Sequence, residues 1–151
     1  MAEHEGQQII TRFWGGSNMQ TRSLSILSQQ TVGYSLTASW ANVPQFIITV
    51  PEDGNYNIGS VCTDEPSDTS SRGGKLALAI NGNRVSQGVE FYESAANLGL
   101  EIPTTLKMDN IPLKANDVVS LQAIYLSGAA AVISYAAGTL AGSLQITKVG
   151  V

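Results

Sequence analysis

The stretch FIITVPEDGNYNIGSV, residues 46–61, decides the fold that the sequence predicts. Apolar side chains recur at every second position on both sides of a short polar insert, a period typical of strands buried on one side. In the insert, Pro51 ends a strand ladder because it lacks an amide donor, and Gly54 can adopt a positive φ without steric cost. We therefore expect a hairpin, with Tyr56 as a large buried ring that anchors two sheets.

The same period of two continues through most of the chain. Residues 75–85, KLALAINGNRV, place Asn81-Gly82 between two such runs, which is the strongest local signal for a hairpin. Further alternation follows in VVSLQAIYL, residues 118–126, and in GSLQITKV, residues 142–149. One weak helical candidate interrupts the pattern at residues 89–99, VEFYESAANLG. The sequence therefore predicts an all-β fold, an antiparallel sandwich or jelly roll.

The composition suggests that part of the surface is covered by other chains. Charged residues make up 13% of the 151 residues and hydrophobic residues 43%, whereas an average soluble protein is about 25% charged. A chain with so few charges has little to cover its outside, which indicates association. The net charge of -4 and the pI near 4.8 argue against a nucleic-acid partner, which would need a clustered basic face.

The first residues differ in character from the rest. We divide the chain into an extended N-terminal arm with a first strand, residues 1–29, and a jelly-roll domain, residues 30–151. In the arm, Phe13 and Trp14 precede a Gly-Gly pair that lets the chain change direction. These two aromatic residues either cap one end of the sandwich or dock the arm into a neighbouring subunit or another protein.

Neither export by a signal peptide nor a membrane span is expected. The polar start MAEHEGQQII has no basic segment followed by an apolar one. No formal charge occurs between Asp117 and Lys148, a stretch long enough to cross a bilayer. Polar residues alternate with apolar ones along it, however, and no Lys/Arg cluster flanks it. We therefore interpret this stretch as strands.

Four segments together resemble the tumour-necrosis-factor-like, or complement globular-head, jelly rolls. The first is F-x-x-x-V-P-E-D-G-x-Y-x-I from Phe46 to Ile58, followed in order by LALAINGNRV, PLKANDVVSL and GTLAGSLQI. The resemblance covers about residues 30 to 149. The sequence departs from the family pattern at Asn116, where the family has Gly, and at Leu140, where it has Phe.

This resemblance implies assembly, because domains of the family commonly form compact threefold trimers around one sheet. We expect a homotrimer, which would also cover a weakly charged surface. The strand 118–126, with Leu121 and Tyr125, is the predicted trimer interface. The alternative is that these two side chains fill the core of a single chain.

The chain offers little reactive chemistry, and we expect no enzyme, no cofactor and no metal site. The single histidine, His4, lies in the polar leader, and the single Cys62 follows the period that buries the preceding strand. An acidic loop with Asp64, Glu65 and Asp68 offers oxygen ligands for a cation such as calcium. It lacks the regular spacing of a calcium loop, so a solvated acidic loop is the commoner interpretation.

These features together predict a structural virion protein of a tailed phage. We expect a trimeric capsid decoration, or cement, protein on the outer surface of the capsid, bound to the major capsid protein through Phe13 and Trp14. The main alternative is a trimeric receptor-binding head of a tail fibre or spike, with Trp40 and Tyr92 available for sugar stacking. A secreted cytokine-like ligand and an enzyme are less favoured alternatives.

Overall fold

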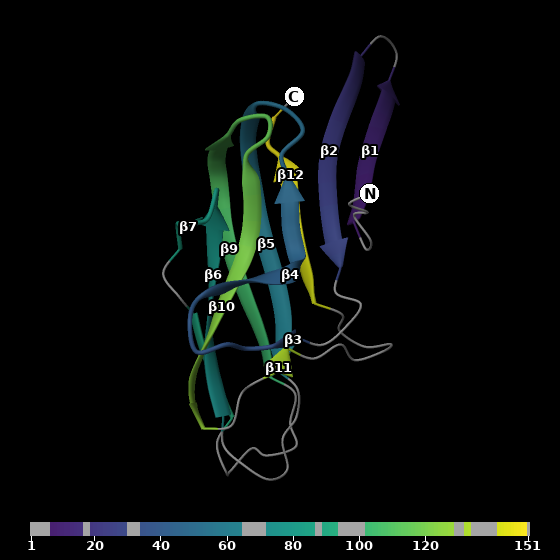
Figure 1. The fold of residues 1–151 in the computed structure, drawn as a ribbon. Helices are drawn as coiled ribbons and strands as arrows, with labels where there is room; N and C mark the ends of the chain where they lie inside the picture. The colour runs from purple at the N-terminus through teal and green to yellow at the C-terminus, as the bar shows by residue number, and fades with distance from the viewer. Residues whose placement is uncertain are drawn as a thin grey trace.

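The structure is a computed structural model that describes residues 7–16, 19–29, 34–64, 72–86, 89–93, 102–128, 132–133 and 142–150. Within these residues the chain forms two antiparallel sheets packed against each other (Figure 1). Sheet A contains β1 (Gln7–Gly16), β2 (Met19–Gln29), β12 (Ser143–Lys148), β5 (Gly54–Asp64), β9 (Ile102–Leu113), β11 (Val132–Ile133) and β3 (Tyr34–Ser35). Sheet B contains β4 (Ala41–Thr49), β10 (Val118–Gly128), β6 (Arg72–Ile80), β7 (Asn83–Arg84) and β8 (Val89–Glu93).

The strand order is that of a jelly roll. In sheet A the order is β1-β2-β12-β5-β11-β3, and β9 pairs with β5; in sheet B it is β4-β10-β6-β7, and β8 also pairs with β6. The chain passes back and forth between the layers, from β2 to β4, back to β5, and on to β6. The predicted all-β antiparallel jelly-roll sandwich is therefore confirmed.

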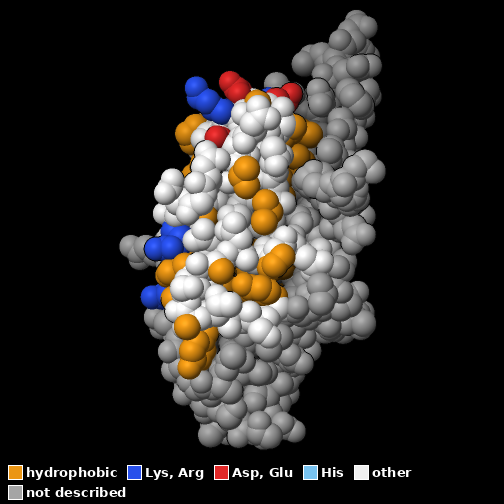
Figure 2. All heavy atoms as spheres, viewed as in Figure 1, with side chains coloured by type: hydrophobic (Ala, Val, Ile, Leu, Met, Phe, Trp, Pro, Cys, Tyr) orange, Lys and Arg blue, Asp and Glu red, His pale blue; other side chains and the backbone are white. Residues whose placement is uncertain are grey.

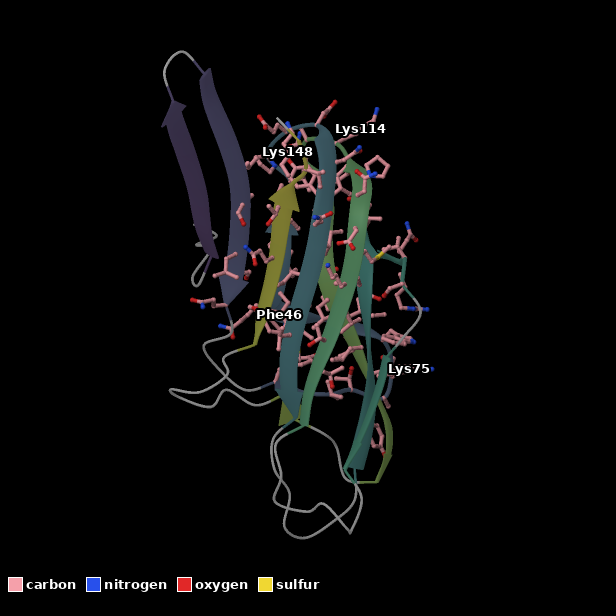
Figure 3. The ribbon with its side chains drawn as sticks, turned by 180° about the vertical axis from the view of Figure 1, so that it is seen from behind. Phe46, Lys75, Lys114 and Lys148 are labelled. Carbon is pink, nitrogen blue, oxygen red and sulfur yellow. The ribbon has the colours of Figure 1, made fainter. Side chains whose placement is uncertain are left out.

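The stretch 46–61 forms two strands, but the predicted hairpin between them is wrong. β4 pairs with β10, whereas β5 pairs with β12 and β9, so the intervening turn carries the chain from sheet B to sheet A. Both strands bury their apolar sides in one core, from opposite layers: Phe46 and Tyr56 are each 0% exposed. Figure 3 shows Phe46 between the two sheets.

The contacts around this turn explain why Gly54 and Tyr56 occupy their positions. Gly54 does not take the positive φ that we expected, since the glycines found there are Gly82 and Gly150. A Cβ at Gly54 would instead collide with the Cε atom of Lys148, whose Nζ lies 2.8 Å from Glu52 Oε1. The ring of Tyr56 is buried as predicted, and its hydroxyl donates to Glu52 O at 2.9 Å. Burial and then the nearby carboxylates raise the pKa of Tyr56.

The Asn81-Gly82 hairpin is confirmed. β6 pairs with β7 through Ile80 and Asn83. Asn81 and Gly82 both have positive φ, 51° and 81°, which is the backbone of a type I′ turn. Beyond Arg84 the ladder is interrupted, and it resumes with β8 along the same edge of β6. The helical candidate at 89–99 is thus a strand from Val89 to Glu93, and its other residues lie outside the described part.

A polar network closes one end of the sandwich, where Lys114 and Lys148 lie in Figure 3. Asn116 has a φ of 73°, so its backbone occupies the left-handed region, which Asn tolerates better than other non-glycine residues. Asp117 accepts a hydrogen bond from Asn81 Nδ2 at 2.9 Å and another from the amide of Lys114 at 2.8 Å. These bonds, led by the one from Asn81, lower the pKa of the Asp117 carboxyl.

The core lies between the two sheets and takes side chains from both. Its largest fully buried members come from strands that alternate in the predicted way: Tyr56, Phe46, Ile26, Ile48, Ile58, Leu76, Leu78, Leu121, Leu144 and Ile146. Burying a Leu or Ile side chain contributes about 1.5–3 kcal/mol, so this cluster is the main source of stability. Because β2 supplies Leu24 and Ile26, residues 19–29 form an integral strand of sheet A.

Candidate interaction surfaces

The two predicted trimer residues occupy different positions. Leu121 is 0% exposed and belongs to the core, which is the alternative that the sequence left open. Tyr125 packs against that core from its edge and is partly buried, and its amide donates to Thr37 O at 2.8 Å. Leu121 offers no surface to a second chain in this arrangement. A contact between copies through Tyr125 stays a prediction.

The predicted docking residues Phe13 and Trp14 lie in β1. Their backbone pairs with β2 opposite Arg22 and Thr21, so the N-terminal segment forms a β-hairpin at the edge of sheet A (Figure 1). Their side chains lie outside the described part of the chain. Their role in docking therefore stays a prediction.

The other candidates from the sequence are placed in part. Glu65, Asp68, His4 and most of the acidic loop lie outside the described residues, and Asp64 ends β5, where its backbone pairs with Ile102. Among the residues that the structure describes, no group of His, Cys, Asp and Glu side chains could hold a metal ion. In the same residues there is no helix long and apolar enough to cross a bilayer.

Cys62 is a core residue, as the period of its strand predicted. Its side chain is 2% exposed on the inner side of β5. Burial raises the pKa of the Cys62 thiol to about 12, against a smaller opposing effect of a hydrogen bond with Ser60. Since the thiolate is the reactive form, both the burial and the raised pKa disfavour reaction of this thiol in the folded protein.

The outer side of sheet A is a broad face with few charges, which we call the A face. It is formed by the residues of β12, β5 and β9 that alternate with the core: Asn57, Gly59, Val61, Thr105, Lys107, Asp109, Ser143, Gln145 and Thr147. Two of these residues, Lys107 and Asp109, are charged. Lys107 Nζ lies 3.5 Å from Asp109 Oδ1, and the two side chains are 69% and 57% exposed. The other residues of the A face have amide or hydroxyl side chains, except for Gly59 and Val61.

A hollow of about 260 Å³ lies in the middle of the A face. It exists because Gly59 has no side chain, and a Cβ built there would meet no atom within 4 Å. Neighbouring strands line it with short polar side chains, including Thr105, Ser143 and Gln145. Gln145 Nε2 donates to Ser25 Oγ at 2.7 Å, which ties β12 to β2 beside the hollow. The A face is therefore open and uncrowded.

The outer side of sheet B carries a chain of polar contacts, which we call the B relay. Arg84 lies over the ring of Trp40, with its Cζ atom 4.6 Å from the ring centroid. Arg84 Nη1 donates to Gln122 Oε1 at 3.4 Å. Gln122 Nε2 donates to Asn42 Oδ1 at 3.2 Å and to Gly82 O at 3.3 Å. The relay thus connects β7, β10 and β4.

The base of the B relay is buried and hydrogen-bonded. Gln122 is 8% exposed, and Ser120, which also donates to Asn42 Oδ1 at 3.2 Å, is 1% exposed. Arg84 and Asn42 are exposed at the other end. Figure 2 shows Lys and Arg side chains on this side of the molecule near the β6–β7 edge and at the end of the sandwich, where acidic side chains also gather. The sequence analysis singled out Trp40 but not Arg84, Gln122 or Asn42.

The comparisons with known proteins concern the fold alone. No family model and no curated protein matches the sequence. Dimeric latent PorU from Porphyromonas gingivalis has a TM-score of 0.51 at 13% identity, over 83% of this chain and 12% of PorU. Eiger TNF from S. frugiperda has a TM-score of 0.49 at 10% identity, over 85% and 92% of the two chains. The module CBM6cm-2 from Cellvibrio mixtus lichenase 5A, solved with cellotriose, has a TM-score of 0.35 at 12% identity, over 99% and 92%.

Proposed function

We propose that this chain is a non-enzymatic structural protein that works as a homotrimer of TNF-like jelly rolls. The observation that carries this proposal is the A face, which is broad and open and whose two charged side chains, Lys107 and Asp109, lie beside each other. Self-association through this face would cover a surface that a weakly charged chain otherwise leaves in water.

The chemistry of the A face suits contact with a copy of itself. Burying a charge without a partner costs several kcal/mol, whereas hydroxyl and amide groups recover most of their cost when they pair. The two charges of the face, Lys107 and Asp109, already neighbour each other at 3.5 Å. The hollow at Gly59 would receive side chains of a neighbouring copy without displacing its own chain. The core of most interfaces is likewise poor in charge.

At a finer level, we propose that the trimer is a capsid decoration, or cement, protein of a tailed phage, on the outer surface of the capsid. The trimer would bridge neighbouring subunits of the major capsid protein, and burial at each contact would raise the barrier to rupture of the shell. Phe13 and Trp14 are the proposed docking residues, because aromatic side chains are frequent hot spots of interfaces. The jelly-roll fold and the low share of charged residues in the chain, 13%, support this assignment.

Two measurements, made one after the other, test the proposal. Sedimentation equilibrium of the purified protein should give three times the chain mass of 15.9 kDa. Undecorated capsids should then bind the trimer to saturation at a fixed ratio to the major capsid protein. A monomer would overturn the assembly, and a trimer without saturable binding would overturn the capsid role alone.

The docking residues have their own test. Replacing Phe13 and Trp14 together by Ala should lower occupancy of the capsid at least tenfold, since loss of a hot spot costs about 2 kcal/mol or more. The mass of the variant in solution should stay that of the trimer. Unchanged occupancy would refute the role of these two residues.

A trimeric receptor-binding head of a phage tail fibre or spike is the second candidate. The B relay favours it, because the exposed Arg84 lies over the partly buried ring of Trp40, an arrangement that a purely structural trimer does not need. Binding of the purified trimer to host cells, rather than to capsids, distinguishes this candidate from the first.

A further inference from the structure

We propose that the B relay is a binding site for the carboxylate of an acidic sugar, with Arg84 as the anion-binding group. This inference does not depend on the proposed function, since a decorating trimer and a receptor-binding head would both present the same outer side of sheet B. It is argued from the direction of the hydrogen bonds, the burial of their base and the ring of Trp40.

The orientation of the Gln122 and Asn42 amide groups follows from which of their neighbours can donate hydrogen bonds and which can accept them. A guanidinium group only donates hydrogen bonds, so Gln122 must turn its Oε1 to Arg84. Its Nε2 then faces Asn42 and the carbonyl of Gly82, at 3.2 Å and 3.3 Å. Asn42 must therefore present Oδ1 inward, where it also accepts from Ser120 Oγ. Consequently its Nδ2 group is the end that points away from the relay.

The exposed end of the relay is thus made of donors alone. Arg84 has five N–H groups, of which the contact with Gln122 uses one. The contact with Trp40 involves the ring face, so it leaves N–H donors at the edge of the guanidinium group. Within the described residues no carboxylate pairs with Arg84, and the carboxylates that form ion pairs there belong to Glu52 and Asp109. Donors without an acceptor favour an anionic ligand, and a carboxylate matches the planar fork of arginine.

The neighbouring ring selects the kind of carboxylate. Trp40 is partly buried beside Arg84, so part of this apolar side chain reaches the surface next to the guanidinium group. A pyranose ring offers C–H groups to such a surface, and its hydroxyl groups accept from an amide such as Asn42 Nδ2. A uronic or sialic acid joins a carboxylate to such a ring. An acidic peptide lacks the rigid ring, and we therefore favour the sugar.

The site is organised before any ligand binds. The side chain of Gln122 is only 8% exposed. The two groups that accept its hydrogen bonds lie in different elements, Asn42 in β4 and Gly82 in the turn before β7. Arg84 lies two residues after Gly82, in a strand whose backbone pairs with Ala79 of β6. Groups that are already held in place lose little conformational freedom on binding.

A titration with small sugars tests the site. Methyl glucuronide and the methyl glycoside of N-acetylneuraminic acid are added to the full chain labelled with ¹⁵N, and the Arg side-chain and Trp indole signals are followed by NMR. We expect saturable shifts with a Kd on the order of 1 mM for at least one of them. Methyl glucoside, which lacks the carboxylate, should bind at least about tenfold more weakly. No shift at the Arg signals with either acid, or equal affinity for methyl glucoside, would overturn the proposal.

Two substitutions test the named residues. Arg84→Lys keeps the charge but loses the planar fork, and should weaken binding by about tenfold or more. Asn42→Asp keeps an inward oxygen for Gln122 and Ser120 but replaces the outward donor by a negative oxygen, and should weaken binding by a similar factor. Lys114→Gln removes one positive charge from an exposed side chain at the end of the sandwich and serves as the matched control, with unchanged affinity expected. Circular dichroism checks that each variant is folded, and native affinity in folded Arg84→Lys would contradict the site.

A peptide rich in Glu, tested in the same titration, separates the two classes of ligand. Weaker binding of this peptide than of the sugar acids supports the proposal. Tighter binding of the peptide through Arg84 would overturn the assignment to sugars.

Discussion

The outer sides of the two sheets are built by the same alternation of residues, yet they present opposite surfaces. On the A face the residues that alternate with the core remain accessible, and the face is hollowed at Gly59. On sheet B the corresponding residues are sealed: Ala77 and Ala79 are 0% exposed, Ser120 1% and Gln122 8%. The segment before β4 contacts β10 on this side, and Trp40 and Arg84 lie over each other there.

This difference is the basis of the two kinds of recognition that we propose for the two outer sides. An open face of small polar side chains adapts to a large partner such as a copy of the chain, because little has to move. A sealed face with a few exposed donors above a buried base suits a small ligand, because the donors keep their geometry. Each of the following predictions tests one side of this contrast.

The largest effect is expected from Gly59→Arg on the A face. The single chain has room for the new side chain, because a Cβ at this position meets nothing within 4 Å. An assembled trimer would have to bury the charge, which costs several kcal/mol. We expect a folded monomer at concentrations where the native protein is a trimer, as measured by sedimentation.

Thr49→Arg is the matched control for this substitution. Thr49 is an exposed residue of β4 in sheet B, so the same charge is added to the other layer. Its mass in solution should equal that of the native protein. Equal assembly of both variants would show that the A face is not the contact.

A large effect is also expected when Cys62, on the inner side of β5, is labelled in the folded protein and in the unfolded protein. Cys62 points into the core, whereas Gly59 opens to the outside. With a pKa raised to about 12, the thiol should react with a disulfide reagent at pH 8 at least about a thousandfold more slowly in the folded protein than in urea. Absorbance of the released thiol measures both rates. Fast labelling of the folded protein would mean that the sheets open readily.

An intermediate effect is expected from the same substitution made on each side of the sandwich. Gln122→Leu removes the base of the B relay and leaves Gly82 O and Arg84 without their partner, which should cost about 1–3 kcal/mol of unfolding free energy. Gln145→Leu removes an exposed amide from the A face, and should change stability by no more than about 0.5 kcal/mol. Urea denaturation measures both. An equal loss of unfolding free energy in the two variants would contradict the difference between the buried outer side of sheet B and the accessible A face.

The smallest effect concerns the end of the sandwich that both sheets share. Because hydrogen bonds lower the pKa of Asp117, its carboxylate stabilises the fold at pH values above the pKa of the unfolded chain, near 4. This stability is lost as the pH falls through the lowered pKa of the folded state. Asp117→Asn should therefore be slightly less stable at neutral pH and should lose less stability below about pH 4 than the native protein. Melting temperatures measured across the acid range check this, and parallel curves would contradict it.

Much of the fold was predictable from local patterns. Alternation identified the buried sides of β4 and β5, and the burial of Phe46, Tyr56 and Cys62 followed from it. The Asn81-Gly82 turn was predictable because few residue pairs tolerate two positive φ angles in succession. Such features depend on a few neighbouring residues, so the sequence contains them directly.

The candidate sites were less accessible, because they join residues far apart in the chain. Asn42, Arg84 and Gln122 belong to three strands, and no spacing in the sequence links them. A weak signal was present, since Gln122 interrupts an apolar run at a position that the period places outside the core. Leu121, next to it, was assigned to a possible interface from the resemblance, and it lies in the core.

The sequence by itself determined which side of each strand faces inward, because hydrophobic burial acts on every second residue regardless of its partner. Apart from the Asn81-Gly82 hairpin, only the tertiary structure decided which strands pair. The turn after Val50 joins two layers rather than two neighbours, and alternation is identical in both cases. The same long-range packing decided that one outer side is left open and the other sealed, since that depends on which distant segment crosses each sheet.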